Sequence, residues 1–143
     1  MHRLVVTVTL FAVCLVSLAN GTTATEENDT PKAAATRKLL KIKVSVDYKD
    51  TTLSDIIDDI KEQIRDKSKK VLGIRVDNKG GVSNNTKFTY KADDKPLEEV
   101  LDEMLKKNDL GYIIVSQRGN AYDGTLLIVK GNARGYPPKK DAK

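Results

Sequence analysis

The sequence predicts an α+β fold in which two helices pack on small β-sheets. Two stretches alternate apolar and polar residues, and each is followed by apolar residues at helical spacing. The whole pattern occurs twice, with an offset of 44 residues. The predicted order of elements is strand, helix, strand, strand, helix, strand, strand (β-α-β-β-α-β-β). We expect the folded unit to span residues 41–130.

A change of period near residue 50 predicts the first strand and helix. Residues 42–48 alternate apolar and polar side chains, which is typical of a strand with one buried face. The helical stripe that follows consists of Leu53, Ile56, Ile57, Ile60 and Ile64. Thr51 or Thr52 is expected to cap this helix. The apolar stretch 72–76 predicts the next strand, and the Gly- and Asn-rich residues 77–85 indicate a loop.

The second half repeats the first. The matching apolar residues are Phe88, Tyr90 and Ala92 in the strand, and Val100, Leu101 and Met104 in the helix. Pro96 suits the start of this helix, where its missing N–H costs nothing. Gly111 is expected to end the helical region, and residues 112–115 and 126–129 to form two more strands. The last strand is apolar on both faces, which favours a central place in a sheet.

The N-terminal residues 1–21 are typical of a secretory signal peptide. A short basic start precedes the apolar run Leu4–Leu18, and cleavage is expected after Ala19, Gly21 or Ala24. The run is shorter than the roughly 20 apolar residues that span a membrane, so we favour processing over a retained anchor. A lipoprotein site at Cys14 is weaker, because no small residue precedes the cysteine. We therefore expect export to the periplasm or the extracellular space.

Both flanks of the domain are predicted to be flexible. Residues 22–40 are rich in Thr, Ala and charge and are expected to form a flexible linker, although residues 33–40 could form a short helical turn. Residues 131–143 contain Pro137 and Pro138 and are expected to form a flexible basic tail.

The distribution of reactive side chains argues against an enzyme. The only histidine is His2 and the only cysteine is Cys14, so removal of the signal peptide leaves neither. Cysteine- or histidine-based metal sites, Ser–His–Asp triads and disulfides are then excluded. We expect no catalytic, metal or cofactor-binding residues and no small-molecule substrate, while a carboxylate-based hydrolase remains the weakest alternative.

The net positive charge is concentrated in the tail. Residues 41–130 contain 17 basic and 16 acidic residues. The tail contains four basic residues and one acidic residue, namely Arg134, Lys139, Lys140, Lys143 and Asp141. A nearly neutral domain lacks the basic footprint that nucleic-acid-binding domains carry. The tail could attract membrane headgroups or acidic polymers, or could simply be solvated.

The doubled pattern resembles the secretin and TonB short N-terminal (STN) domain family. Residues 94–101 read Asp-Lys-Pro-Leu-Glu-Glu-Val-Leu, close to the phrase that opens a helix in that family, and residues 50–57 match it without the proline. Gly111-Tyr112, the Gly119-Asn120 turn and the last apolar strand are similar to the family's ending. The resemblance covers about residues 41–130. It implies a non-catalytic envelope module that docks onto proteins, but no residue-level binding site.

Several motifs are candidate sites. Residues 79–86 only superficially resemble a phosphate-binding loop, and Lys79 stands where a calcium loop needs an oxygen ligand. The paired carboxylates Asp58-Asp59, Asp93-Asp94 and Glu98-Glu99 are interpreted as surface charge or caps. Lys67, Lys69, Lys70 and Arg75 could bind anions but suit a solvated helix end. Tyr48, Tyr90 and Tyr112 are expected in the core, and Tyr122 at the surface. Asn28 and Asn84 begin glycosylation sequons.

These observations lead to a functional hypothesis. We expect a non-catalytic exported module that binds envelope proteins, either by pairing an exposed sheet edge with a partner strand or by packing sheet on sheet. The alternative is a ferredoxin-like domain that binds an acidic polymer or nucleic acid through its basic tails. The sequence does not identify the partner or the residues that bind it.

Overall fold

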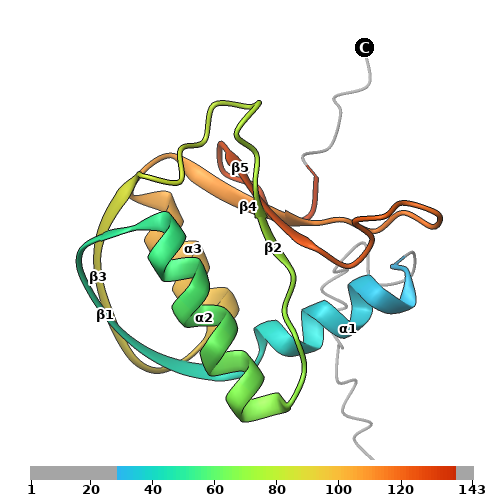
Figure 1. Ribbon diagram of the computed structural model, residues 1–143, viewed down its shortest axis with the longest axis horizontal. Coiled ribbons are helices and arrows are strands. Elements are labelled where there is room, and N and C mark those ends of the chain that lie inside the picture. The colour runs from blue at the N-terminus through green and yellow to red at the C-terminus, as the bar shows by residue number, and fades with distance from the viewer. Residues whose placement is uncertain (1–28, 138–143) are drawn as a thin grey trace, which may run out of the picture.

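The computed structural model describes residues 29–137, which form three helices and six strands (Figure 1). In chain order they are α1 (Pro31–Leu40), β1 (Lys43–Thr52), α2 (Leu53–Ser68), β2 (Ile74–Val76), β3 (Lys87–Pro96), α3 (Leu97–Lys106), β4 (Leu110–Ile114), β5 (Leu126–Lys130) and β6 (Arg134–Gly135). The predicted α+β class is confirmed. The predicted signal peptide, with its cleavage sites, lies outside the described residues.

Helices α2 and α3 lie between two sheets (Figure 1). On one side β1 and β3 form a long, curved antiparallel ribbon, and on the other the strand order is β2-β5-β4-β6. The predicted helical stripe of α2 is buried, as are Val100, Leu101 and Met104 of α3. The core therefore lies where the two helices meet the inner faces of both sheets.

The β1–β3 ribbon has an approximate internal twofold axis between Asp47 and Lys91, which pair with each other and are 44 residues apart. Equivalent pairs lie on either side: Val46–Ala92 matches Tyr48–Tyr90, Val44–Lys95 matches Thr51–Phe88, and Lys43–Pro96 matches Thr52–Lys87. Two register shifts also match, and each contains an aspartate with positive φ, Asp50 at 51° and Asp94 at 50°. The two halves thus share a bulged strand as well as an apolar pattern.

Each of the two core helices is anchored at its start by the other half of the molecule. Leu53 N–H donates to the Thr86 carbonyl at 2.8 Å, and Leu97 N–H donates to the Ile42 carbonyl at 3.0 Å. Thr52 is the cap of α2, since its side chain accepts a hydrogen bond from Asp55 N–H. Pro96 precedes α3 without a side-chain cap.

The expectation of a flexible linker over residues 22–40 was wrong for its described part, where α1 forms. Thr30 caps α1, Pro31 is its first residue, and Leu39 and Leu40 are buried. The Thr36 hydroxyl donates to the Gly124 carbonyl at 2.5 Å, and the Thr30 hydroxyl donates to Asp123 at 2.6 Å. The sequence signal was weak because the buried face of α1 has large apolar residues, Leu39 and Leu40, only at its end, and Ala33 and Thr36 before them.

The expectation of a flexible tail over residues 131–143 was wrong for residues 134–135, which form β6 beside β4. Arg37 of α1 holds this end of the chain in place. Its guanidinium donates to the Gly135 carbonyl at 3.0 Å, stacks on Tyr136 at 3.7 Å from the ring centre, and forms an ion pair with Asp29. Residues 138–143 lie outside the described part.

Candidate functional site: a groove at the β2 edge

Strand β2 is an edge strand, because it pairs only with β5 among residues 29–137. The Leu126 N–H donates to the Gly73 carbonyl, and the Asp77 N–H donates to the Ile128 carbonyl. In a parallel ladder, every second residue of a strand directs its backbone N–H and C=O to the same neighbouring strand. Gly73, Arg75 and Asp77 therefore direct theirs to β5. The backbone groups of Ile74 and Val76 point the other way, to the outer edge of the sheet. The Val76 carbonyl accepts from Asn78 N–H at 3.0 Å. The Ile74 N–H and carbonyl and the Val76 N–H remain at the outer edge.

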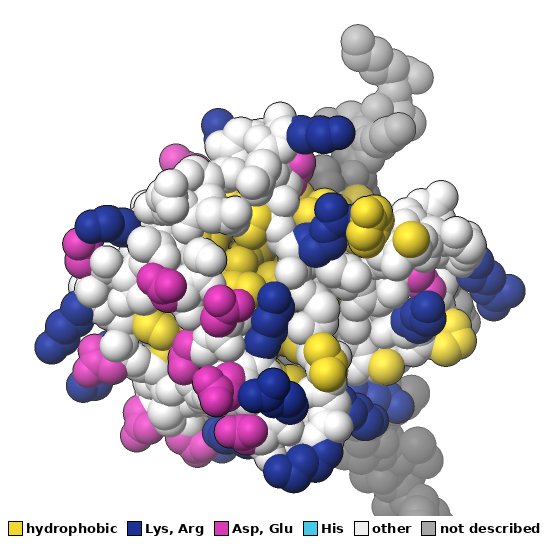
Figure 2. All heavy atoms as spheres, viewed as in Figure 1, with side chains coloured by type: hydrophobic (Ala, Val, Ile, Leu, Met, Phe, Trp, Pro, Cys, Tyr) yellow, Lys and Arg dark blue, Asp and Glu magenta, His cyan; other side chains and the backbone are white. Residues whose placement is uncertain are grey.

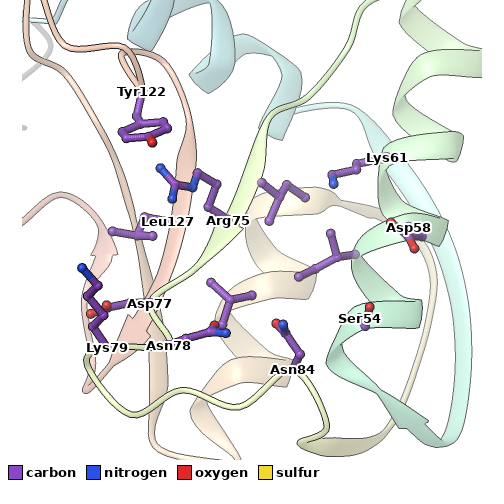
Figure 3. A pocket seen from close by; sticks show the side chains of 13 residues that line it. Ser54, Asp58, Lys61, Arg75, Asp77, Asn78, Lys79, Asn84, Tyr122 and Leu127 are labelled. Carbon is purple, nitrogen blue, oxygen red and sulfur yellow. The ribbon is translucent and has the colours of Figure 1, made fainter.

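An open groove of about 740 Å³ lies alongside this edge, between β2 and α2 (Figure 3). Ser54, Asp58 and Lys61 line it from successive turns of one face of α2. Ile57, Ile74, Val76 and Leu127 supply its apolar lining. Asn78, Lys79 and Asn84 of the loop between β2 and β3 line one end. The groove therefore presents a strand edge next to both apolar and hydrogen-bonding side chains.

Figure 2 shows this face of the molecule, where hydrophobic side chains lie in a hollow near the centre, bordered by charged ones. Arg75 and Tyr122 lie at the groove's border, with the Arg75 guanidinium 3.6 Å from the centre of the Tyr122 ring (Figure 3). This stacking keeps a cation and an aromatic surface together beside the edge. Among the described residues, Lys61, Arg75 and Lys79 have no ion-pair partner within 4.0 Å.

The structure separates the sequence's candidate anion-binding residues. Arg75 lies in the groove, whereas Lys67 donates to the Lys43 carbonyl at 2.6 Å and Lys69 is the left-handed C-cap of α2. Tyr122 is 51% exposed, so its predicted surface position is confirmed. The resemblance of residues 79–86 to a phosphate loop fails, because the loop leads into β3 and not into a helix.

The paired carboxylates do not act as pairs. Asp58 lines the groove, while Asp59 accepts from the Tyr48 hydroxyl at 2.6 Å. Asp93 accepts from the Ser45 hydroxyl, and Asp94 accepts from Lys43 across the ribbon. Glu99 forms an ion pair with Lys95, its neighbour four residues earlier on the surface. Within residues 29–137 no three histidine, cysteine or acidic side chains gather as metal ligands would.

Tyr48, Tyr90 and Tyr112 are buried, as the sequence predicts. The Tyr90 hydroxyl donates to Glu103 at 2.5 Å, and burial followed by this bond raises the pKa of Tyr90 to about 12. Burial also raises the pKa of Tyr48 and of Tyr112. In Glu103 the same Tyr90 bond, with an ion pair to Lys95, lowers the pKa of the carboxyl. Tyr48 and Tyr90 are therefore core groups whose hydroxyls donate to carboxylates, Asp59 and Glu103.

Sequence reasoning found Tyr122 and the strand but not the groove. The stack of Arg75 on Tyr122 joins residues 47 positions apart, and nothing local signals it. That β2 lies at an edge depends on β4 and β6 occupying the other side of β5.

Comparison with known proteins gives no assignment: no family model, no curated protein and no solved structure matches this chain. Among residues 29–137, none of the helices combines the length and apolar character needed to cross a bilayer.

Proposed function

We propose that this protein is an exported, non-catalytic module of the STN type that docks onto proteins of the cell envelope. The single observation that carries this proposal is the β2 edge, which no strand within residues 29–137 covers on its outer side, beside a groove. An extended segment of the partner would lie in the groove and add a strand next to β2. The order β1-α2-β2-β3-α3-β4-β5 supports the STN resemblance, and the apolar signal-like start supports export.

The backbone groups at the outer edge of β2 define which hydrogen bonds a partner segment can form. It offers the Ile74 N–H and carbonyl and the Val76 N–H, so a segment of three or four residues satisfies them in one register. Partner side chains that face inward would contact the apolar lining near Ile57. Those that face outward would lie next to Arg75 and Tyr122. Backbone pairing would supply affinity, and these two sets of contacts would supply specificity.

The long β1–β3 ribbon is a poorer docking edge. Its bulges at Asp50 and Asp94 interrupt a regular ladder on both strands, and its outward face carries cross-strand ion pairs. Bulges and charges are the devices by which exposed edges resist pairing with other chains. Short β2 has neither a bulge nor a proline in its ladder, and it has an apolar groove beside it.

Site-specific crosslinking in the native host tests this proposal. A photo-crosslinking residue at position 75, in the groove, is expected to capture one or a few envelope proteins. The same residue at Lys49, an exposed position on β1, is expected not to capture them. The captured contact should depend on the strand edge: Val76→Pro removes the outward N–H and should abolish it, because proline cannot donate.

Val76→Ala is the matched control, since it removes the same partly buried side chain but keeps the N–H. Both variants should first show cooperative unfolding. Equal crosslinking by Val76→Pro and Val76→Ala would contradict strand pairing. Identical products from positions 75 and 49 would contradict the groove as the docking site.

A further inference from the structure

A second surface of the molecule combines an exposed apolar residue with lysines that form no ion pair within residues 29–137. Val71, in the turn between α2 and β2, is 80% exposed and is the most exposed large hydrophobic side chain among the described residues. Lys69 and Lys70 precede it, and Pro31, Lys32, Ala34, Ala35 and Lys38 of α1 lie across from this turn. We call these residues the Val71 surface.

The turn that presents Val71 is held in a defined conformation. Lys69 adopts a left-handed conformation with φ of 58°, and its N–H donates to the Arg65 carbonyl at 2.8 Å. The Ser68 hydroxyl donates to the Ile64 carbonyl at 2.7 Å and accepts from Lys70 N–H at 3.1 Å. Leu72, the next residue, is buried. The chain is therefore anchored on both sides of Val71, and the valine is held outward.

Two shallow grooves flank α1 on this surface. One, of about 540 Å³, is lined by Pro31, Ala34, Ala35 and Ile42 together with Lys38 and Lys70. The other, of about 300 Å³, is lined by Val71, Ala35 and Leu39 together with Lys32 and Lys70. Ala35, Leu39 and Lys70 border both grooves, so the apolar side chains form one continuous area. Figure 2 shows hydrophobic side chains bordered by Lys and Arg in the lower part of this face.

The charge around this area is mostly positive. Lys32, Lys38, Lys69 and Lys70 form no ion pair with described residues. The one carboxylate that lines either groove is Asp123. It already accepts hydrogen bonds from the Thr30 hydroxyl and from Gln117 N–H. Three lysines, Lys32, Lys38 and Lys70, thus line the two grooves against a single carboxylate, Asp123, and Lys69 precedes Lys70 in the chain.

We propose that the Val71 surface binds an anionic lipid surface, with Val71 entering the interface and the lysines contacting headgroups. The charge complementarity argues for an anionic occupant, and lysines next to such a membrane each add to binding. The apolar centre argues for lipid over nucleic acid or polysaccharide, because those polymers would leave Val71 in water. This surface shares no lining residue with the β2 groove but adjoins it, since Gly73 and Asp123 line the one and Ile74 and Tyr122 the other.

A tryptophan at position 71 tests this proposal directly. The chain contains no tryptophan, so Val71→Trp in the full chain places a single fluorophore at the proposed point of insertion. Vesicles of phosphatidylcholine with one quarter phosphatidylglycerol should shift its emission to the blue, and brominated lipid should quench it. Because the probe is local, any membrane binding by the apolar N-terminal run does not itself produce this signal. Tyr122→Trp, at the groove, is the matched control and should not shift.

The lysines are tested in the Val71→Trp background. Lys69→Glu with Lys70→Glu should weaken binding to the anionic vesicles by roughly tenfold or more, and raised salt should weaken binding of the parent. Lys106→Glu with Lys107→Glu, at the end of α3, is the matched charge reversal and should have a smaller effect. The proposal is overturned if the emission of the Val71→Trp variant does not shift, if it shifts equally on pure phosphatidylcholine, or if both charge reversals act alike. Binding of DNA with no shift on vesicles would also overturn it.

Discussion

The two halves of this molecule begin alike and end differently. Each starts with a bulged strand that leads directly into a helix, and the twofold pairing of β1 with β3 holds these starts together. After the helices the symmetry is lost. The first half continues into β2, which has three residues and lies at a sheet edge, whereas the second continues into β4, which has five residues and pairs on both sides.

The two core helices also differ in length: α2 has 16 residues and α3 has 10. The longer helix carries the lysine-rich turn with Val71, and the shorter one leads into a closely packed strand. The equivalent parts of the two halves thus form the core, while both proposed interaction surfaces occur where the halves diverge. In this fold the repeat explains stability, and departures from the repeat supply the candidate sites.

The largest effect is expected in the shared core. Ile60 and Met104 are equivalent under the 44-residue offset and are 1% and 0% exposed. We expect Ile60→Ala and Met104→Ala each to lower the free energy of unfolding by about 2–5 kcal/mol, because each leaves a cavity. Chemical denaturation of both variants measures this. A loss confined to one variant would show that the halves do not share one core.

Two glycines test how differently β2 and β4 are packed. A Cβ at Gly111 in β4 would lie 2.4 Å from the Ala133 carbonyl oxygen, whereas at Gly73, just before β2, its nearest contact is Thr125 Oγ1 at 3.5 Å. We expect Gly111→Ala to cost about 1–3 kcal/mol, since backbone must move. Gly73→Ala should be neutral or stabilise slightly. Thermal unfolding compares the two, and equal losses would contradict the close packing of β4 against residue 133.

The buried tyrosines of both halves predict an alkaline transition. Because folding raises the pKa of Tyr90 from 10.0 to about 12, the unfolded chain loses this proton first as pH rises. Stability is therefore complete below pH 10 and is lost as pH rises toward 12. Tyr48, whose pKa is also raised, acts in the same sense. The free energy of unfolding measured against pH should fall over this alkaline range. The double variant Tyr48→Phe, Tyr90→Phe should show a smaller fall.

The smallest effect is expected for two symmetric ion pairs on the ribbon. Lys43 lies 3.1 Å from Asp94, and Lys87 lies 2.6 Å from Asp50. All four side chains are more than half exposed, so water screens both pairs. Double-mutant cycles with Lys43→Ala, Asp94→Asn and Lys87→Ala, Asp50→Asn should give coupling energies of about 0–1 kcal/mol, similar to each other. Asn is used because it tolerates the positive φ of both aspartates. Unequal coupling energies would show that the two halves of the ribbon are not energetically equivalent, and large ones would show that water does not screen the pairs.

Local patterns allowed a large part of the fold to be predicted. The alternation in 42–48 and the stripe from Leu53 to Ile64 are properties of neighbouring residues, so they predicted β1 and α2 without reference to the rest of the chain. For α1 this reasoning allowed only a short helical turn at residues 33–40, because Ala33 and Thr36 do not look apolar enough to be buried. Helix α1 lies close to Gly124, where a Cβ would come within 2.7 Å of Lys32 Cβ, and the Gly124 carbonyl accepts from Thr36, 88 residues earlier.

By itself the sequence determined the α+β class, the duplicated core and the scarcity of reactive side chains, because these follow from composition and short-range periodicity. Only the tertiary structure decided that β2 lies at an edge, that Arg75 stacks on Tyr122, and that Val71 faces α1 and its lysines. These features depend on which strand neighbours β5 and on where separate segments meet. Contacts between distant residues are set by the packing of whole elements, and no local pattern encodes them.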